Sequence, residues 1–533
     1  MNKKCYIIIF VLSILYTQSL DSLLLKQKNT QSNRDNEYKI LNQYLELFEN
    51  DKSNYEYLSE IKEILITKKE FDELITIYEQ HIENISESNK LFERKVELLE
   101  IKIWANKKDW EESLILIINN GNINQTKIEY ILYKLIQNKK IDKTYELVKK
   151  FRTEYNKPHF FSKKLISVFK KNNRKKDTIE ESLIYLIYGS AHRNNSVTNK
   201  IIIEQIFNLC DEILEIALID NFILPISNKQ FSSNAFLNSN FYEIQKIDDI
   251  QYVINVYKKL IEQDMFYEKS KLRLADINYK ILNDFDKAYN IYEEVEKKSS
   301  KISIDTEAIL GKTDILISKG YLDSAQSIIN HQKELLTKFT SHQTKQDLVN
   351  ELDYKNTQIL FYQGSYQEMN LSLDSLIQTL ELKNKNCNDL LEVKTIALFF
   401  NQEQESFKKY SSIQHKIKMN KSFESILELI QLMDTENILI SELAQFQYGI
   451  IELGKGNIKN AQQIISSMNQ KTIFYELSLI INAEIEDHIY QNYKNAIKLY
   501  EEFINKYPNS IYKENILKRL NQLYKLLNEE LDS

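Results

Sequence analysis

Only eight glycines and three prolines occur among the 533 residues of this chain. Average usage of roughly 7% Gly and about 5% Pro would place on the order of 37 and 27 of them in a chain of this length. The tight turns of sandwiches, barrels and doubly wound sheets need glycine at positive φ or proline at a fixed φ. The shortage largely excludes those folds and predicts an all-α protein with short polar connections.

The charge balance is close to even. Seventy basic and 76 acidic residues give a net charge of −6, and the two signs are interspersed along the chain. A nucleic-acid footprint needs a basic face, and a membrane-surface anchor needs a basic amphipathic helix. We find neither beyond the N-terminus, so we expect no nucleic-acid partner. Apolar residues make up 43% of the chain, which is enough for a packed core.

The N-terminus predicts export. Met1–Lys4 is cationic and is followed by the apolar run Tyr6–Leu15, which is too short to cross a hydrocarbon core of roughly 30 Å. Thr17 and Ser19 place small residues at −3 and −1 of a cleavage site. We predict a signal peptide over 1–19, with an uncleaved anchor as the alternative, and a polar tether over 20–37. The mature chain then has no integral membrane span and is periplasmic or lies in the cell envelope.

After the leader only two cysteines remain, Cys210 and Cys387. They are far apart in the sequence, so we expect two buried free thiols rather than a disulfide framework.

The rest of the chain repeats one helical pattern. Each copy is aligned on a small or apolar anchor residue in a second helix, with an apolar residue three positions before it and a larger one four positions after it, on the same helix face. The anchors are Leu74, Ser113, Thr144, Val253, Ala288, Ala325, Met369, Ala461 and Ala496. Nine positions before most anchors stands another apolar residue, such as Leu65, Trp104 or Leu135, which would pack across from the first helix.

Turn residues gather five positions before the anchors, where the first helix must stop. Gly320, Gly364 and Gly456 occupy this slot in three of the copies. A residue after the end of a helix often adopts the left-handed conformation that glycine tolerates best. The slot therefore marks the turn between the two helices of each repeat.

This pattern resembles the tetratricopeptide repeat, a helix–turn–helix of 34 residues with A-x₃-F in its second helix and a proline after it. Ala496, Tyr500 and Pro508 give the best copy, and Gly449, Gly456 and Ala461 match two glycine slots and the alanine slot. The resemblance implies an α-solenoid. The frequent Lys, Ile and Asn, together with the short leader, are similar to secreted repeat proteins of Bacteroidota.

Two arrays are predicted, with N-terminal repeats over 38–195 and C-terminal repeats over 247–533. The segment 196–246 between them contains Pro225 and the polar run 227–240, in which Phe residues are interspersed. We interpret it as an irregular insertion or a domain boundary, which either packs on the solenoid or joins the two arrays as a loop.

No constellation for catalysis, a cofactor or a metal is recognisable. The seven His residues form no i, i+4 pair on one helix face, and no cysteine lies beside them at ligand spacing. The motif at Gly454–Gly456 lacks a third glycine and follows a helix, so a phosphate loop is not indicated. We predict no enzyme activity and no cofactor.

Function then depends on shape. The resemblance implies a concave groove, lined by the first helices, that binds protein or peptide partners. The positions that contact partners in such repeats fall here on Arg273, Ile277, Lys280, Tyr354, Gln358 and Phe361. A merely solvated helix surface is the alternative at these positions.

We therefore expect an exported scaffold for protein–protein interaction, which can associate with envelope assemblies. The alternative is the recognition array of an enzyme with a cryptic catalytic segment near 160–246.

Overall fold

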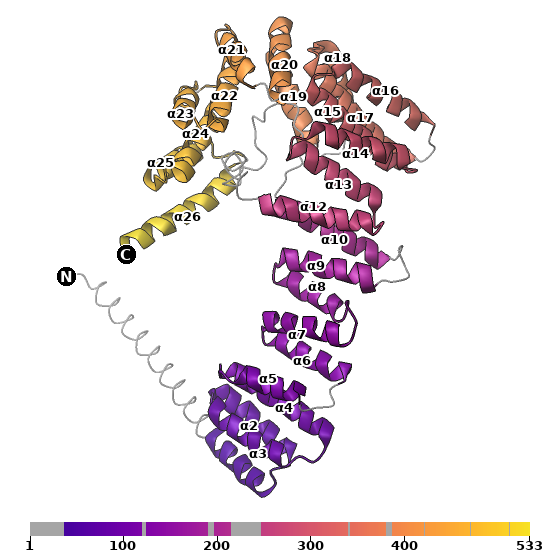
Figure 1. Cartoon of the computed structure of the whole chain (residues 1–533). Coiled ribbons are helices and arrows are strands. Elements are labelled where there is room, and N and C mark those ends of the chain that lie inside the picture. The colour runs from indigo at the N-terminus through magenta and orange to yellow at the C-terminus, as the bar shows by residue number, and fades with distance from the viewer. Residues whose placement is uncertain are drawn as a thin grey trace, which may run out of the picture. The chain divides into compact units, whose positions relative to one another are not determined.

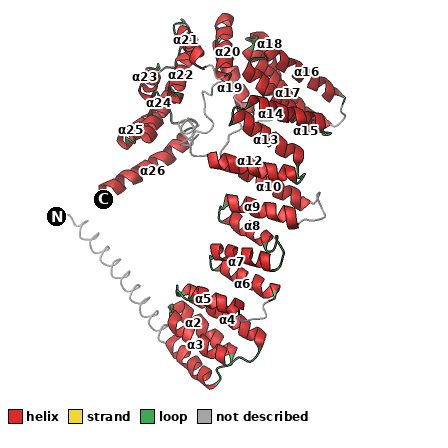
Figure 2. Cartoon of the chain, in the orientation of Figure 1, coloured by secondary structure: helices red, strands yellow, loops and turns green. Residues whose placement is uncertain are grey.

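The computed structural model describes residues 37–119, 124–189, 197–214, 247–338, 342–379, 386–419, 422–469, 471–510 and 512–532. All regular elements in these ranges are helices, as Figure 2 shows. The all-α prediction is thus confirmed for the described part of the chain. No helix there is both long enough and apolar enough to serve as a membrane span.

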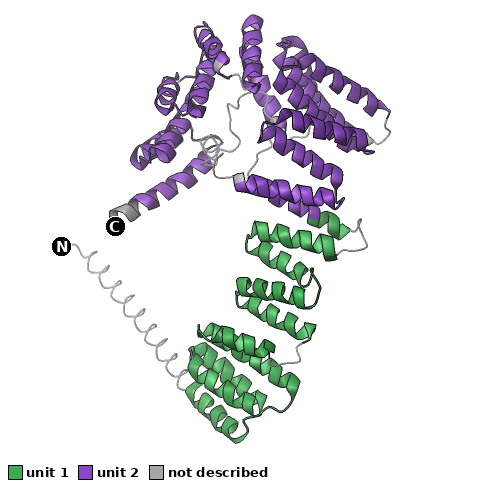
Figure 3. Cartoon of the chain, in the orientation of Figure 1, with its two compact units in different colours: residues 1–202 green, residues 203–533 purple. Residues whose placement is uncertain are grey.

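The chain divides into two compact units, residues 1–202 and 203–533 (Figure 3). In unit 1 the residues 37–50 are helical and precede the labelled helices of Figure 1. These are α2 (Tyr55–Lys68), α3 (Phe71–Glu83), α4 (Ser88–Trp104), α5 (Trp110–Asn119), α6 (Gln125–Gln137), α7 (Ile141–Glu154), α8 (Ser162–Lys171), α9 (Lys175–Ile184) and the π-helix η1 (Tyr185–Gly189). The division falls within α10 (Val197–Leu214).

Unit 2 is also built of consecutive helices. Its first helices are α12 (Ile247–Glu262), α13 (Tyr267–Lys280), α14 (Phe285–Lys298), α15 (Ile302–Lys319), α16 (Leu322–Thr337), α17 (His342–Tyr362), α18 (Tyr366–Thr379) and α19 (Cys387–Phe399). They are followed by α20 (Gln404–Lys418), α21 (Ser422–Met433), α22 (Ile438–Gly454), α23 (Ile458–Ser466), α24 (Ile473–Glu484), η2 (Ile485–Ile489), α25 (Tyr493–Lys506) and α26 (Lys513–Asp532). Helices consecutive in sequence contact one another along most of the unit, as expected of a solenoid of helical repeats.

The predicted register matches the packing. Eight of the nine anchors are fully buried, namely Leu74, Thr144, Val253, Ala288, Ala325, Met369, Ala461 and Ala496. Every residue four positions later is buried as well, and the residue three positions earlier is the first residue of its helix in all copies except that of Val253. Each second helix therefore presents one narrow apolar face to the first helix of its repeat.

The turn slot adopts the predicted left-handed conformation. Its φ is +87° at Gly320, +73° at Gly364 and +79° at Gly456. Non-glycine residues take the same conformation in four other copies, at Lys69, Lys139, Asn283 and Gln491.

A backbone hydrogen bond closes many of these turns. The residue after the slot donates its N–H to the carbonyl five residues back, as Glu70 does to Leu65 at 3.0 Å and Asn457 does to Glu452 at 3.0 Å. This is the helix-ending motif that a left-handed residue permits.

One copy departs from the register. Ser113 is only half-buried, and Leu114 beside it is fully buried instead. In the preceding helix Ile103 is buried, whereas Trp104, which the pattern placed in the core, is 40% exposed. The left-handed residue is Asn106 rather than Lys108, because the turn from 105 to 109 is longer here.

A further copy was missed in the sequence. The pair α8 and α9 has its left-handed residue at Asn173 and buries Thr178 and Ser182 in the anchor and +4 positions. Phe169, nine positions before Thr178, is fully buried. The pattern expects a larger apolar residue four positions after the anchor and an apolar residue three positions before it, whereas this copy has Ser182 and Lys175 there.

Some predicted features lie outside the described residues. They are the leader over 1–19, the tether up to residue 36, and the part of the irregular insertion that spans 215–246. The insertion's earlier part is corrected, since 197–214 is helix α10. Ile203, Ile206, Phe207, Cys210 and Leu214 recur at helical spacing and are buried.

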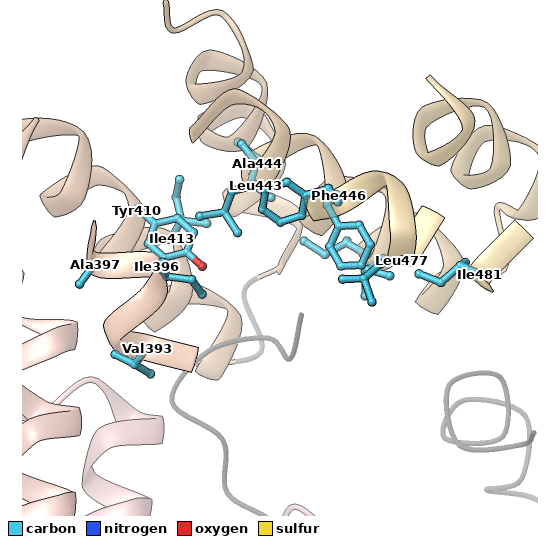
Figure 4. Close-up of a cluster of buried hydrophobic side chains, with 14 of the residues drawn as sticks. Val393, Ile396, Ala397, Tyr410, Ile413, Leu443, Ala444, Phe446, Leu477 and Ile481 are labelled. Carbon is cyan, nitrogen blue, oxygen red and sulfur yellow. The ribbon is translucent and has the colours of Figure 1, made fainter. Parts of the chain in front are cut away.

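Unit 2 contains a crossing that a plain solenoid lacks. Helix α20 contacts α15 and α17 as well as α18 and α21. His415 on α20 donates from Nε2 to the carbonyl of Ile317 at 3.0 Å, across 98 residues, and its ring stacks on Tyr362 of α17 at 5.2 Å. The buried cluster continues from α19 and α20 through α22 to α24 (Figure 4).

Gly456→Ala should lower the free energy of unfolding by about 1–2 kcal/mol, the cost of a left-handed non-glycine residue. An added Cβ there would meet no atom within 4 Å, so only the backbone conformation is penalised. The measurement is urea unfolding of the full chain, followed by hydrogen exchange in α22 and α23. Gln491→Gly is the matched control and should not destabilise. If Gln491→Gly lowered the free energy of unfolding more than Gly456→Ala does, the assigned role of the slot would be contradicted.

Candidate protein-binding surface

Three of the predicted partner-binding residues lie on α13, and they differ in exposure. Lys280 is exposed, whereas Ile277 is buried at 3% exposure. Arg273 is half-buried between carboxylates, 3.3 Å from Asp211 Oδ2 and 3.7 Å from Asp276 Oδ2. Burial acts to lower the pKa of Arg273, but Asp211 and Asp276 outweigh it and raise the pKa. Arg273 therefore holds α10 and α13 together.

The other three predicted residues lie on α17 and are buried. Tyr354 donates its hydroxyl to Asp389 of α19, and Gln358 accepts a hydrogen bond from Lys355 Nζ at 2.9 Å. Phe361 packs edge-on against Phe407 of α20 at 5.8 Å. None of the three is available to a partner in this structure.

The burial of α17 has a plain cause. The family positions assume that the first helix of each repeat faces solvent, but α17 contacts α15, α16, α18 and α20. Because α20 lies across α15 and α17, the side chains that would line an open groove become core. Of the six predicted residues only Lys280 is freely exposed, and Lys280 is on a different helix from the three on α17.

A different surface fits partner binding better, and it lies in unit 1. We call it the first-helix surface, and it is formed by Tyr55 of α2, Trp104 of α4, and Tyr130 and Tyr133 of α6. These side chains are 37%, 40%, 37% and 41% exposed, in that order. All four stand on first helices of consecutive repeats, where neighbouring side chains reach from one repeat to the next.

Hydrogen bonds and cations fix the aromatic rings of this surface. The Arg94 guanidinium lies 3.3 Å from the centroid of the Tyr55 ring, and Lys134 Nζ lies 5.6 Å from that of Tyr130. Trp104 donates its indole N–H to Asn138, the C-cap residue of α6, at 2.5 Å, and Asn138 in turn donates to Glu100 of α4 at 3.0 Å. The rings are thus held in place before any partner arrives, which lowers the entropy cost of binding.

Glu97 is the electrostatic centre at the α2–α4 end. It accepts hydrogen bonds from Arg94 at 2.6 Å and from the Tyr78 hydroxyl at 2.8 Å, and Lys62 lies 3.8 Å away. Burial alone would raise the pKa of Glu97, but Arg94, Lys62 and Tyr78 outweigh it and hold the pKa below its ordinary value. Glu97 is therefore ionised at neutral pH and ties α2, α3 and α4 together.

Sequence reasoning missed this surface because it assigned the aromatic residues to core positions by default. Trp104 was placed in the packing slot, and a longer turn moved it outward. Tyr130 and Tyr133 were not singled out, although their spacing of three puts them on one face of α6. The same spacing test, applied outside the core positions, would have found them.

Metal chemistry finds no support in the described ranges, where no three His, Cys, Asp or Glu side chains gather as ligands. Cys210 and Cys387 are both buried free thiols. Burial raises the pKa of Cys210 to about 12, so this thiol is protonated at neutral pH and unreactive.

Comparison with known proteins supports the repeat type in the C-terminal region. A family model described as tetratricopeptide repeat matches residues 475–510, which span α24, η2 and α25. This is the copy with the best sequence match, around Ala496 and Tyr500. No curated protein matches the sequence.

Solved structures with similar chains include Naa15/Naa10 bound to HypK-THB and the yeast protein Tom70. The first shares 11% identity over 94% of this chain and 90% of that chain, at a TM-score of 0.22. Tom70 shares 11% identity over 83% of this chain and 97% of that chain, at 0.21. The APC/C hetero-tetramer Cut9-Hcn1 shares 12% identity over 91% of this chain and 94% of that chain, at a TM-score of 0.20. At these scores the likeness carries no weight for function.

Tyr354→Phe should lower the free energy of unfolding by about 1–3 kcal/mol, because it removes a donor from a buried carboxylate. Urea unfolding of the full chain with hydrogen exchange in α17 and α19 measures the effect. Tyr321→Phe is the control, since that tyrosine is 59% exposed. Equal stability of both variants would show that the Tyr354 hydroxyl has no structural role.

Unit 1 should lose stability in acid through Glu97. Its folded-state pKa is depressed, so the stabilisation is present above the unfolded pKa of about 4.5 and is lost as pH falls through the lower folded pKa. Both tryptophans, Trp104 and Trp110, lie in unit 1, so their fluorescence follows this unit within the full chain.

Glu97→Gln should therefore lower the urea midpoint at pH 7 and flatten its dependence on pH between about 5 and 3. Glu93→Gln, in the same helix and with its carboxylate exposed, is the control and should keep the wild-type slope. A wild-type slope in Glu97→Gln would refute the assignment.

Proposed function

We propose that this chain is an exported scaffold that holds protein partners in the periplasm or cell envelope and performs no catalysis itself. One observation carries the binding part of the proposal, the first-helix surface of unit 1. Tyr and Trp are enriched at the centres of protein interfaces, where they supply large contact areas with few rotatable bonds. The four rings of this surface are exposed and already fixed by their neighbours.

Export is proposed from the leader alone. The cationic start, the short apolar run and the small residues at Thr17 and Ser19 are the features of a cleavable signal peptide. A helical repeat array offers an extended surface to partners, and the tetratricopeptide match at 475–510 is consistent with that use.

The test is site-specific photocrosslinking in the native cells. Tyr130 or Tyr133 is replaced by p-benzoylphenylalanine, and Tyr321, an exposed tyrosine of unit 2, is replaced in the same way as the control. Illumination should give a defined protein adduct from the Tyr130 and Tyr133 positions and none from Tyr321. Fractionation of the same cells should place the adduct in the periplasm or envelope.

Three results would each overturn one part of the proposal. Absence of any protein adduct from both positions of α6 would remove the scaffold function. Recovery of the chain in the cytoplasm with its leader intact would remove the export. A substrate turned over by the purified chain would contradict the absence of catalysis.

A further inference from the structure

One helix of unit 1 has a predominantly basic solvent face. On α8 the exposed residues are Lys163, Lys164, Ser167, Lys170 and Lys171, with no acidic residue among them. Lys163 and Lys170 are seven residues apart, as are Lys164 and Lys171, so each pair lies on one side of the helix at about 10 Å separation. On the helix, the four lysine positions form a strip two residues wide and two turns long.

This strip corrects the impression of evenly interspersed charge. Between residues 163 and 176 the sequence contains seven basic residues and no acidic one. The even balance of the whole chain concealed the block. α8 is also the basic amphipathic helix that the sequence reading did not find.

The opposite face of α8 is buried in the core of the repeat. Leu165 and Phe169 are fully buried, and Val168 is 9% exposed. Ser162 accepts a hydrogen bond from Arg152 at 2.7 Å. Because its apolar side is buried, α8 cannot insert that side into a bilayer, as an interfacial helix does. The lysines are held at the surface of a fixed helix.

Three carboxylates of the helices on either side of α8 are paired with arginines. Arg152 pairs with the buried Glu181 at 2.6 Å, and Arg174 pairs with Asp142 at 2.6 Å and with Asp177 at 2.6 Å. Within the described ranges none of the four lysines of α8 takes part in an ion pair. Their charge is therefore not neutralised by this part of the chain.

Two tyrosines border the strip and help to decide its ligand. Lys164 Nζ lies 4.8 Å from the ring centroid of Tyr133, and Lys163 Nζ lies 5.2 Å from that of Tyr185. A single-stranded nucleic acid needs open ring faces on which bases stack. Here a lysine covers a face of each ring, whereas the phenol hydroxyl of the exposed Tyr133 can still donate to a carboxylate.

We propose that the lysine strip of α8 docks an extended acidic segment of a protein partner. The proposal rests on the scaffold function and names the chemistry of one partner. Alternate side chains of an extended segment lie roughly 7 Å apart on one face, so a strip about 10 Å long accepts two or three carboxylates. Tyr133 belongs to the first-helix surface, so the acidic segment would continue the partner's contact with that surface.

Fluorescence anisotropy on the full chain tests this with three probes. They are a short labelled peptide of alternating Glu and Ser, a labelled oligouridylate, and vesicles of phosphatidylglycerol and phosphatidylcholine. The variant combines Lys163→Glu, Lys164→Glu, Lys170→Glu and Lys171→Glu. The control combines Lys494→Glu and Lys498→Glu, two exposed lysines of α25. Tryptophan fluorescence verifies that unit 1 remains folded, and Lys170→Gln with Lys171→Gln is used if it does not.

The peptide should bind the wild type and the control equally, and the quadruple variant roughly tenfold or more weakly, with salt reducing the difference. Equal peptide affinity in the quadruple variant would overturn the proposal. Tighter binding of the oligouridylate or the vesicles, lost in the same variant, would assign the strip to that other class. If the peptide result overturns the proposal but p-benzoylphenylalanine in place of Tyr133 still crosslinks a protein in the quadruple variant, the scaffold function stands and only the acidic-segment proposal fails.

Discussion

Eight of the nine recognised repeats depend on one interaction, the burial of an anchor side chain and of a second side chain one turn later against the preceding helix. Ala288 with Tyr292 and Ala496 with Tyr500 show the geometry, in which a small residue allows close approach and a ring fills the space beside it. Gly311 extends the same principle, because a Cβ there would lie 2.3 Å from the Tyr292 ring. Close packing of this kind leaves little room for a larger side chain.

In some repeats a polar residue takes the place of the apolar residue that packs from the first helix. Glu452 and Asp487 occupy the first-helix packing slot in the last two copies and are both buried. Glu452 accepts hydrogen bonds from Asn457 in the following turn and from Asn460 in α23. Asp487 accepts hydrogen bonds from Nε and Nη2 of Arg519, both at 2.7 Å, which joins η2 to α26. A buried carboxylate is stable in such a slot because neighbouring donors satisfy it.

The sequence was informative where local spacing decides the outcome. Helix starts, anchor burial and the left-handed turn residues follow from spacing within one repeat, so Gly320, Ala325 and Ile329 could all be placed in advance. The partner-binding residues could not, because whether Phe361 faces solvent depends on α20, a helix more than forty residues further along the chain. The lysines of α8 were missed for another reason, since composition averages charge over the chain. The basic run from 163 to 176 is visible in the sequence, and the fold shows that four of its lysines share one exposed face.

The crossing of α20 over α15 and α17 also implies that parts of unit 2 resist a pulling force differently. In a plain solenoid each helix pair contacts only its neighbours, so a pulling force can peel repeats off one at a time. The bond from His415 to Ile317 and the stack of His415 on Tyr362 instead tie the end of α20 to helices far earlier in the chain. Helices α15 to α20 therefore stabilise one another. Under a pulling force we expect them to unfold together as one block, whereas the repeats on either side can unfold one at a time.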